Sequence, residues 1–210
     1  MFDFTFDKSD IILLFIKAIV LFTALPVHEY AHGAVANYLG DHTPGYQGRL
    51  TLNPFAHLDI MGSICILLTG FGWAKPVQVN PNNFTKVNRK TGMVLTSLAG
   101  PLSNVTMALI VMIIFKLLII FITPASTTMF WIMLALRYMI QINLGLAVFN
   151  MLPIPPLDGS KILTLFLPER YYFKLIQNQQ IIFMILIFLM FSRVLDGPLS
   201  FLVNLLWQLL

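Results

Sequence analysis

Residues 11–33 read IILLFIKAIVLFTALPVHEYAHG, a long apolar run that ends in a cluster of ionisable side chains. Before the cluster only Lys17 is charged, so the run is typical of a helix that lies in a membrane. The cluster holds His28, Glu29 and His32 in the spacing His-Glu-x-x-His. Placing such groups at membrane depth is costly, which indicates that they have a function there.

If this stretch is helical, the motif predicts a metal site. Residues four apart lie on one face of an α-helix, so His28 and His32 can direct both imidazoles at one ion. Glu29 lies about 100° further round the helix, beside the ion and not necessarily bound to it. This geometry suits two metal ligands and a general base that acts on a metal-bound water. The structural alternative is a polar histidine pair that packs between helices.

The composition predicts an integral membrane protein. Of the 210 residues, 58% are hydrophobic and only 10% are charged, whereas a soluble domain has roughly 25% charged residues. We therefore expect one membrane-embedded domain over residues 1–210, with a core at 11–165 and C-terminal helices at 181–210. The net charge of +4 is spread over loops, which favours topology signals over a nucleic-acid surface. A single cysteine excludes an intrachain disulfide.

The apolar segments predict an all-α integral membrane protein, a polytopic helix bundle of about 4–5 spans. The first span is expected at residues 11–39; at 1.5 Å per residue it is about 43 Å long and exceeds the ~30 Å hydrocarbon core. Two more are expected at 91–122 and 129–151. The segments 181–191 and 199–210 form either one span with an interfacial helix or a helical hairpin, and the sequence leaves both open.

Residues 41–91 do not resemble an ordinary span, because glycine and proline interrupt them. Their apolar part, residues 58–69, is too short to cross a membrane. The alternation at residues 77–79 is typical of a strand. We therefore expect a small re-entrant or interfacial segment with short strands at 45–56 or 73–80, whose backbone is satisfied by protein or by a wet cavity.

Basic residues in the loops predict the orientation of the chain. Residues 75–90 contain four basic side chains and no acid, and the loop after Gly159 is also basic, whereas the N-terminus is acidic. Since basic loops face the cytoplasm, the end of the first helix that carries His28 and His32 is expected on the cytosolic side.

Asp158 is the candidate for a third metal ligand. Catalytic zinc sites have three protein ligands and one open position. Asp158 lies near the end of the sequence FNMLPIPPLDG, residues 149–159, where three prolines stiffen the chain and Gly159 permits a tight turn. The orientation above places it at the depth of the two histidines. Asn150, at the end of the span expected at residues 129–151, could donate a hydrogen bond to a developing oxyanion.

Together these motifs resemble the site-2 protease family of intramembrane zinc metalloproteases. The motif His-Glu-x-x-His is followed by Asn-x-x-Pro-x-x-x-x-Asp-Gly at residues 150–159, with every spacing matched. GPLSN at residues 100–104 is similar to the glycine-containing motif of the family. GWAKPV at 72–77, with Asn80-Pro81, is similar to a loop of its short bacterial members. The resemblance covers residues 20–165.

The resemblance implies a set of roles for the site residues. The Zn²⁺ ligands would be His28, His32 and Asp158. The catalytic base would be Glu29, and Asn150 would polarise the substrate carbonyl. It also implies a transmembrane protein as substrate, the lipid bilayer as surroundings and a bacterial plasma membrane as location. The sequence departs from the family in having no recognisable PDZ or CBS domain, which leaves substrate selection unexplained; nothing in it indicates the oligomeric state.

Two further polar residues are candidates for substrate contact. Asn104 lies in the glycine-containing motif, and the alternative for it is packing between helices. His57 could serve a substrate loop, and a surface-loop role is an equal alternative.

The function predicted from these observations is an intramembrane zinc metalloprotease that acts in regulated intramembrane proteolysis. A membrane metal-binding or transport protein would place its ligands along a path through the bilayer, whereas the candidates here fall at one depth. A catalytically inactive relative would have lost a ligand or Glu29, and this sequence retains all of them.

Overall fold

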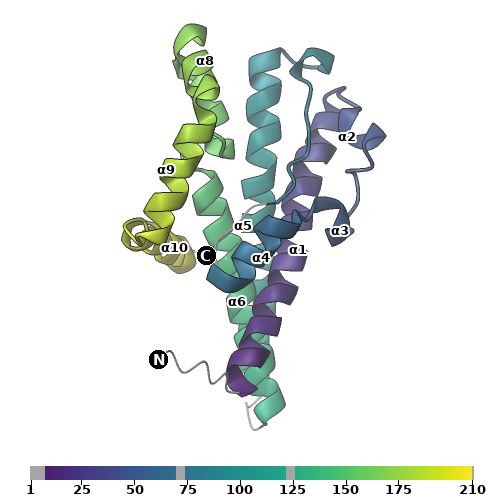
Figure 1. Ribbon diagram of the computed structural model, residues 1–210. Helices are drawn as coiled ribbons and strands as arrows, with labels where there is room; N and C mark the ends of the chain where they lie inside the picture. Colours follow the sequence, from purple (N-terminus) through teal and green to yellow (C-terminus); the bar gives the residue numbers. More distant parts are fainter. Residues whose placement is uncertain (1–7, 70–73, 122–125, 210) are drawn as a thin grey trace.

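The computed structural model describes residues 8–69, 74–121 and 126–209. In these ranges the chain folds into helices joined by loops and contains no strand, which confirms the predicted all-α architecture. Three long helices form its centre: α1 (Lys8–Tyr38), α5 (Arg89–Phe121) and α6 (Thr127–Asn150). Each contacts the other two, and Figure 1 shows them side by side.

These central helices are the candidate membrane spans. Each is long and apolar enough to cross a membrane, and their bounds agree with the expected spans to within one helical turn. Two further helices, α8 (Glu169–Gln177) and α9 (Gln179–Phe191), form a fourth span only if this pair, bent by 63°, counts as one. The described residues therefore contain three spans, or four at most, so the upper end of the expected range is not reached.

The C-terminal helix α10 (Asp196–Leu209) is too short to cross the membrane and packs against α6 instead. Its residues Val203, Leu206 and Trp207 contact the core. In Figure 1, α8, α9 and α10 lie on one flank of the central helices. This arrangement favours one bent span followed by a short helix over a helical hairpin.

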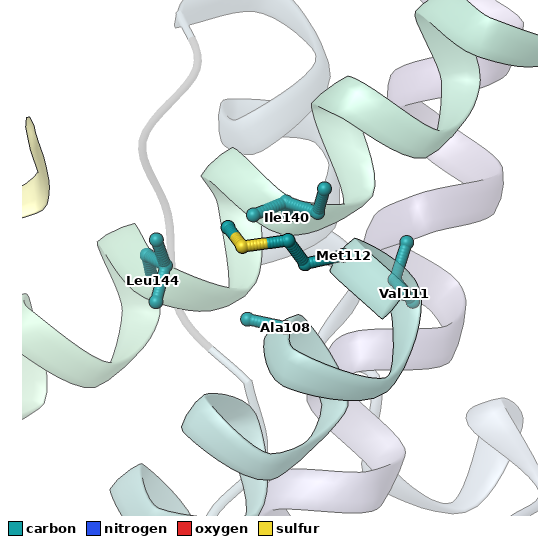
Figure 2. Packing of buried hydrophobic residues seen from close by; sticks show 5 residues of the cluster. All are labelled: Ala108, Val111, Met112, Ile140 and Leu144. Carbon is teal, nitrogen blue, oxygen red and sulfur yellow. The ribbon is translucent and has the colours of Figure 1, made fainter. Parts of the chain in front are cut away.

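Apolar side chains between α5 and α6 form the core of the bundle. Ala108, Val111 and Met112 from α5 meet Ile140 and Leu144 from α6 in one buried cluster (Figure 2). Ala108 has no exposed surface, and its small side chain permits a close approach of the two helices. Because dense packing resists displacement, this cluster fixes α5 and α6 relative to each other.

Short helices and one extended stretch connect α1 to α5. The helices are α2 (Thr43–Tyr46), α3 (Pro54–His57), α4 (Ile60–Thr69) and η1 (Pro81–Asn83). The short strands expected at 45–56 or 73–80 are absent from the part of this segment that the structure describes. It contains only an isolated antiparallel bridge between Leu58 and Ala74. Gly72 and Trp73 of the loop similar to that of bacterial family members lie outside the described residues.

Residues 74–86, which are extended as far as Asn80 and then pass through η1, are called the strap below. Apart from the isolated bridge at Ala74, its backbone N–H groups bond with side-chain carboxylates and with the carbonyl oxygens of His57 and Leu39, and not with a neighbouring strand. This is why the alternation at 77–79 does not produce a sheet.

A tight return of the chain follows α6 and leads into η2 (Asp158–Ile162) and α7 (Leu163–Phe166). A Cβ atom at Gly159 would lie 2.5 Å from the carbonyl carbon of Met151 and 2.7 Å from the carbonyl oxygen of Leu152. Real side chains do not approach backbone this closely, so the return requires glycine at this position. The return places Asp158 against the central helices.

Candidate active site

The structure brings the three predicted ligands together. His28 and His32 lie one turn apart on α1, and their Nε2 atoms are 3.0 Å from each other. Asp158 lies at the start of η2, far from the histidines in the sequence, and its Oδ2 atom is 3.2 Å from both Nε2 atoms. Both histidines are buried, so the cluster is shielded from solvent. These three side chains make up a group that can hold one metal ion.

The outer nitrogens of both rings face carbonyl oxygens. Nδ1 of His28 is 2.6 Å from the amide oxygen of Asn104, and Nδ1 of His32 is 2.7 Å from the backbone carbonyl oxygen of Thr96. A carbonyl oxygen only accepts hydrogen bonds, so each Nδ1 carries the proton of a neutral ring. Both Nε2 atoms therefore present lone pairs toward each other.

This arrangement fits a cation. Two lone pairs 3.0 Å apart repel each other unless a positive charge lies between them. The Oδ2 atom of Asp158 is buried and has no hydrogen-bond donor among the described residues, so it adds a third electron pair. Two imidazoles with fixed outer hydrogen bonds and one carboxylate are a ligand set typical of catalytic zinc.

Asp158 is a carboxylate in this environment. Burial opposes its ionisation, whereas a positive charge on the neighbouring imidazoles of His28 and His32 favours it and lowers the pKa of Asp158 below its ordinary range. Lys161, in the same turn of η2, is also partly buried, and burial lowers the pKa of its ammonium group although Asp158 acts in the opposite direction.

Glu29 lies beside the cluster and does not belong to it. Its Oε2 atom accepts a hydrogen bond of 2.9 Å from the backbone N–H of Val77, on the strap. The side chain is buried, and the possible metal ligands in the described residues do not include it. This placement agrees with the neighbouring position that helical geometry predicts for the residue after His28.

Backbone hydrogen bonds fix the strap on both sides of Val77. On one side, the N–H of Lys75 donates to the carbonyl oxygen of His57 over 2.8 Å. On the other side, the N–H of Asn80 donates to Oδ2 of Asp41 over 2.7 Å, and the N–H of Thr85 donates to the carbonyl oxygen of Leu39 over 3.0 Å. The strap is therefore held across the C-terminal part of α1, where Glu29 lies.

Asp41 is the main anchor of the strap. Its carboxylate has no exposed surface and accepts hydrogen bonds from Thr43, Asn80 and Asn83. Burial opposes ionisation, but these donors outweigh burial and hold the pKa of Asp41 below its ordinary value.

Gly100 explains why α5 approaches the cluster so closely. A Cβ atom at this position would lie 2.6 Å from Cε1 of His28 and 2.6 Å from Cε1 of His32. The absence of a side chain lets α5 pass directly against both rings. The same helix then supplies their outer hydrogen-bond acceptors from Thr96 and Asn104.

The other predicted site residues are Asn150, Asn104 and His57. Asn150 ends α6, and its amide nitrogen donates to the carbonyl oxygen of Leu146 in its own helix over 3.0 Å. That nitrogen carries a second hydrogen, so its role toward a substrate carbonyl stays a prediction. Asn104 and His57 have no exposed surface, and substrate contact by them also stays a prediction. In this structure Asn104 contacts His28, and Nε2 of His57 is 2.8 Å from the carbonyl oxygen of Thr51.

Sequence reasoning did not identify three groups that support the site. These are the backbone carbonyl of Thr96, the carboxylate of Asp41 and the amide of Asn143. Asn143 had a usable signal, because it is a polar residue in an apolar span and lies two helical turns before Asn150. The backbone carbonyl had none, since any residue type supplies it.

Comparison with known proteins finds similarity to zinc metalloproteases. The model of "Peptidase family M50" matches residues 117–192, which include Asn150 and Asp158. The chain is 41% identical over 180 residues to the putative zinc metalloprotease YwhC of Bacillus subtilis, covering 80% of this chain and 78% of that protein. It is 32% identical over 165 residues to the putative zinc metalloprotease MJ0611 of Methanocaldococcus jannaschii, covering 77% and 76%.

More distant similarity extends to the putative zinc metalloprotease Rip2 of Mycolicibacterium smegmatis. There the identity is 31% over 141 residues, covering 65% of this chain and 51% of that protein. No solved structure matches the chain significantly.

Proposed function

Because the chain belongs to peptidase family M50, the site-2 protease family of zinc metalloproteases, we propose that it cleaves membrane proteins in or near their transmembrane segments. The observation that carries the proposal is the convergence of His28, His32 and Asp158 among helices long and apolar enough to cross a membrane. A protease whose ligands are buried in such a bundle has membrane-embedded chains as its nearest substrates.

The cofactor is Zn²⁺, and His28, His32 and Asp158 would hold it. When bound, zinc supplies a Lewis acid that polarises a peptide carbonyl and lowers the pKa of a water to ~7. The remaining steps belong to the chain. Glu29 takes a proton from the attacking water and delivers it to the leaving nitrogen as the C–N bond breaks.

The strap supports this role of Glu29. The N–H of Val77 donates to Oε2 and restrains the carboxylate, and Oε1 would be the oxygen that transfers the proton. Asn150 would donate its second amide hydrogen to the carbonyl oxygen on which negative charge develops.

A helical substrate must unwind before its peptide bond can be attacked, because its own hydrogen bonds shield the carbonyl. The extended strap, next to Glu29, offers backbone with which an unwound segment could pair. The partner we propose is therefore a transmembrane chain that lies extended at the site.

The site is proposed to face the cytosol of a bacterial plasma membrane. The strap and the start of α5 carry Lys75, Lys86, Arg89 and Lys90, all at the end of the bundle where α1 reaches the strap. In Figure 1 the first turns of α1 lie at the opposite end of the central helices. Basic loops on the side of the site favour a cytosolic orientation and a supply of water from that side.

The alternatives are a membrane metal-binding or transport protein and a catalytically inactive relative, and specific observations disfavour both. The ligands lie within 4.8 Å of one another and not along a path, and Glu29 is present beside them. A glutamate next to a ligand has no necessary role in transport.

The test is cleavage of transmembrane peptides by the purified protein in micelles. The wild type should cleave, a zinc chelator should abolish cleavage, and Glu29→Gln should keep its zinc but lose about 10²–10⁴-fold in rate. Glu169→Gln makes the same chemical change in α8 and should cleave normally. Wild-type rates in Glu29→Gln would refute the role of Glu29, and cleavage restricted to soluble peptides would refute the proposed substrate class.

A further inference from the structure

Three hydrogen bonds lead from α6 to the outer nitrogen of His28. The amide nitrogen of Asn143 donates to the carbonyl oxygen of Met139 over 2.8 Å. The amide nitrogen of Asn104 donates to Oδ1 of Asn143 over 2.8 Å, and Oδ1 of Asn104 lies 2.6 Å from Nδ1 of His28. We call these two side chains the amide relay. Both have no exposed surface, so no bulk water competes for their hydrogen bonds.

A backbone group sets the direction of the relay. The carbonyl oxygen of Met139 can only accept, so Asn143 must turn its amide nitrogen toward it. The opposite orientation would place two oxygens 2.8 Å apart. Oδ1 of Asn143 then faces Asn104 and requires a donor, which is the amide nitrogen of Asn104. Only Oδ1 of Asn104 is left for His28, so Nδ1 of that ring carries the proton.

His28 needs such an anchor and His32 does not. The acceptor for His32 is the backbone carbonyl of Thr96, whose direction the helix fixes. The acceptor for His28 is a side-chain amide, whose oxygen and nitrogen can exchange places by rotation without changing shape. An Asn104 turned the other way would offer N–H to Nδ1 and move the ring proton to Nε2, where it would block metal ligation.

We propose that Asn143 is a positioning residue that, through Asn104, keeps the proton of His28 on Nδ1 and presents Nε2 to the metal. The inference rests on zinc ligation by His28, which is part of the proposed function. It does not depend on which peptide the enzyme cleaves. Asn143 touches neither the metal ligands' donor atoms nor the space between them, and it acts only through the orientation of one amide.

Two substitutions separate this role from packing. Asn143→Leu keeps the branched shape of the side chain and removes the acceptor for Asn104. Asn143→Asp keeps an oxygen that accepts from Asn104 in either protonation state, but it places an acid in an apolar helix. If Asn143 only fills space, the leucine variant should be the better tolerated; if it directs the relay, the aspartate variant should be.

The measurements are zinc affinity, by competition with a chelator, and the position of the His28 ring proton, by ¹⁵N NMR of zinc-free protein at alkaline pH. The chain has four histidines, and loss of signal in His28→Ala assigns the ring. We expect Asn143→Leu to bind zinc about 10–100-fold more weakly, as loss of an outer hydrogen-bond partner typically does. Its Nδ1-protonated population should fall, whereas Asn143→Asp should stay near the wild type in both readouts.

Ser103→Ala is the matched control, because its hydroxyl only donates to the carbonyl oxygen of Gly100 in its own helix. Zinc affinity of Asn143→Leu equal to that of the wild type, or better than that of Asn143→Asp, overturns the proposal. If Asn143→Leu does not fold, ¹⁵N NMR of the zinc-free wild type is the test. A His28 ring protonated mainly on Nε2 would also overturn the proposal. Neither readout uses a substrate, so failure of the relay and failure of the proposed proteolysis are distinguishable.

Discussion

Gly100→Ala is expected to weaken zinc binding, because the added methyl group displaces both histidine ligands. The added methyl carbon would lie 2.6 Å from Cε1 of His28 and from Cε1 of His32, whereas carbon atoms in contact prefer about 3.5–4.0 Å. Each ring must therefore move by roughly 1 Å relative to α5. Productive metal geometry tolerates only about 0.5 Å.

The magnitude follows from the cost of overpacking. Inserting a methyl group into a close-packed site costs about 1–3 kcal/mol, which corresponds to a loss of about 5- to 150-fold in zinc affinity if the strain is borne by the metal-bound state. Zinc affinity by chelator competition and the thermal midpoint of unfolding measure the effects on zinc binding and on the fold separately.

Gly145→Ala is the matched control for this experiment. Gly145 also lies inside a long helix, α6, but a Cβ atom there would meet no atom within 4 Å. Alanine should leave zinc binding unchanged and stabilise the helix by roughly 0.5–1 kcal/mol. If Gly100→Ala binds zinc like the wild type, α5 does not press against the two imidazoles and the account of the glycine is wrong.

Three other substitutions test separate parts of the structure. Val77→Pro removes the N–H that donates to Glu29. Since a hydrogen bond to a charged group contributes about 1.5–3 kcal/mol, cleavage should fall about 10- to 150-fold while zinc affinity stays unchanged. Unchanged turnover would contradict the strap's role. Asp41→Asn should remove the contribution of Asp41 to the pH dependence of folding stability. The pKa of Asp41 is lowered in the folded state, so its contribution is present above the ordinary carboxyl pKa and is lost as the pH falls through the lower, folded value. Thermal midpoints of wild type and variant should therefore converge on acidification, and a constant gap would refute this. Ile140→Ala should cost about 2–5 kcal/mol of unfolding free energy at a fully buried position without changing zinc affinity, and a cost below about 1 kcal/mol would mean that the α5–α6 core is loosely packed.

The helices and the metal cluster were predictable because their signals are local or strongly constrained. Apolar runs placed α1, α5 and α6 to within one turn. The spacing of His28 and His32 defines one helical face, and the prolines and Gly159 before and after Asp158 indicate a rigid return. Each of these features follows from the length of an apolar run, from the periodicity of the α-helix, or from the backbone conformations that proline and glycine allow.

The strap could not be predicted, because its contacts are side chain to backbone and far apart in sequence. Val77 and Glu29 are 48 positions apart, and nothing in a backbone N–H identifies its acceptor. The alternating residues 77–79 predicted a strand, but the N–H of Val77 donates to the carboxylate of Glu29, and the N–H of Asn80, the next residue along, donates to that of Asp41. Alternation indicates extended backbone, and it does not reveal whether a second strand lies beside it.

The most direct test of the account is the zinc X-ray absorption spectrum of the purified protein and of Asp158→Ala. We expect one zinc per chain in the wild type, with two imidazole nitrogens at about 2.0–2.1 Å and carboxylate or water oxygens at about 2.0–2.2 Å. Asp158→Ala should lose the carboxylate signal and most of its zinc. A wild-type spectrum with a single imidazole, or full zinc occupancy with an unchanged spectrum in Asp158→Ala, would show that these three side chains do not hold the same ion.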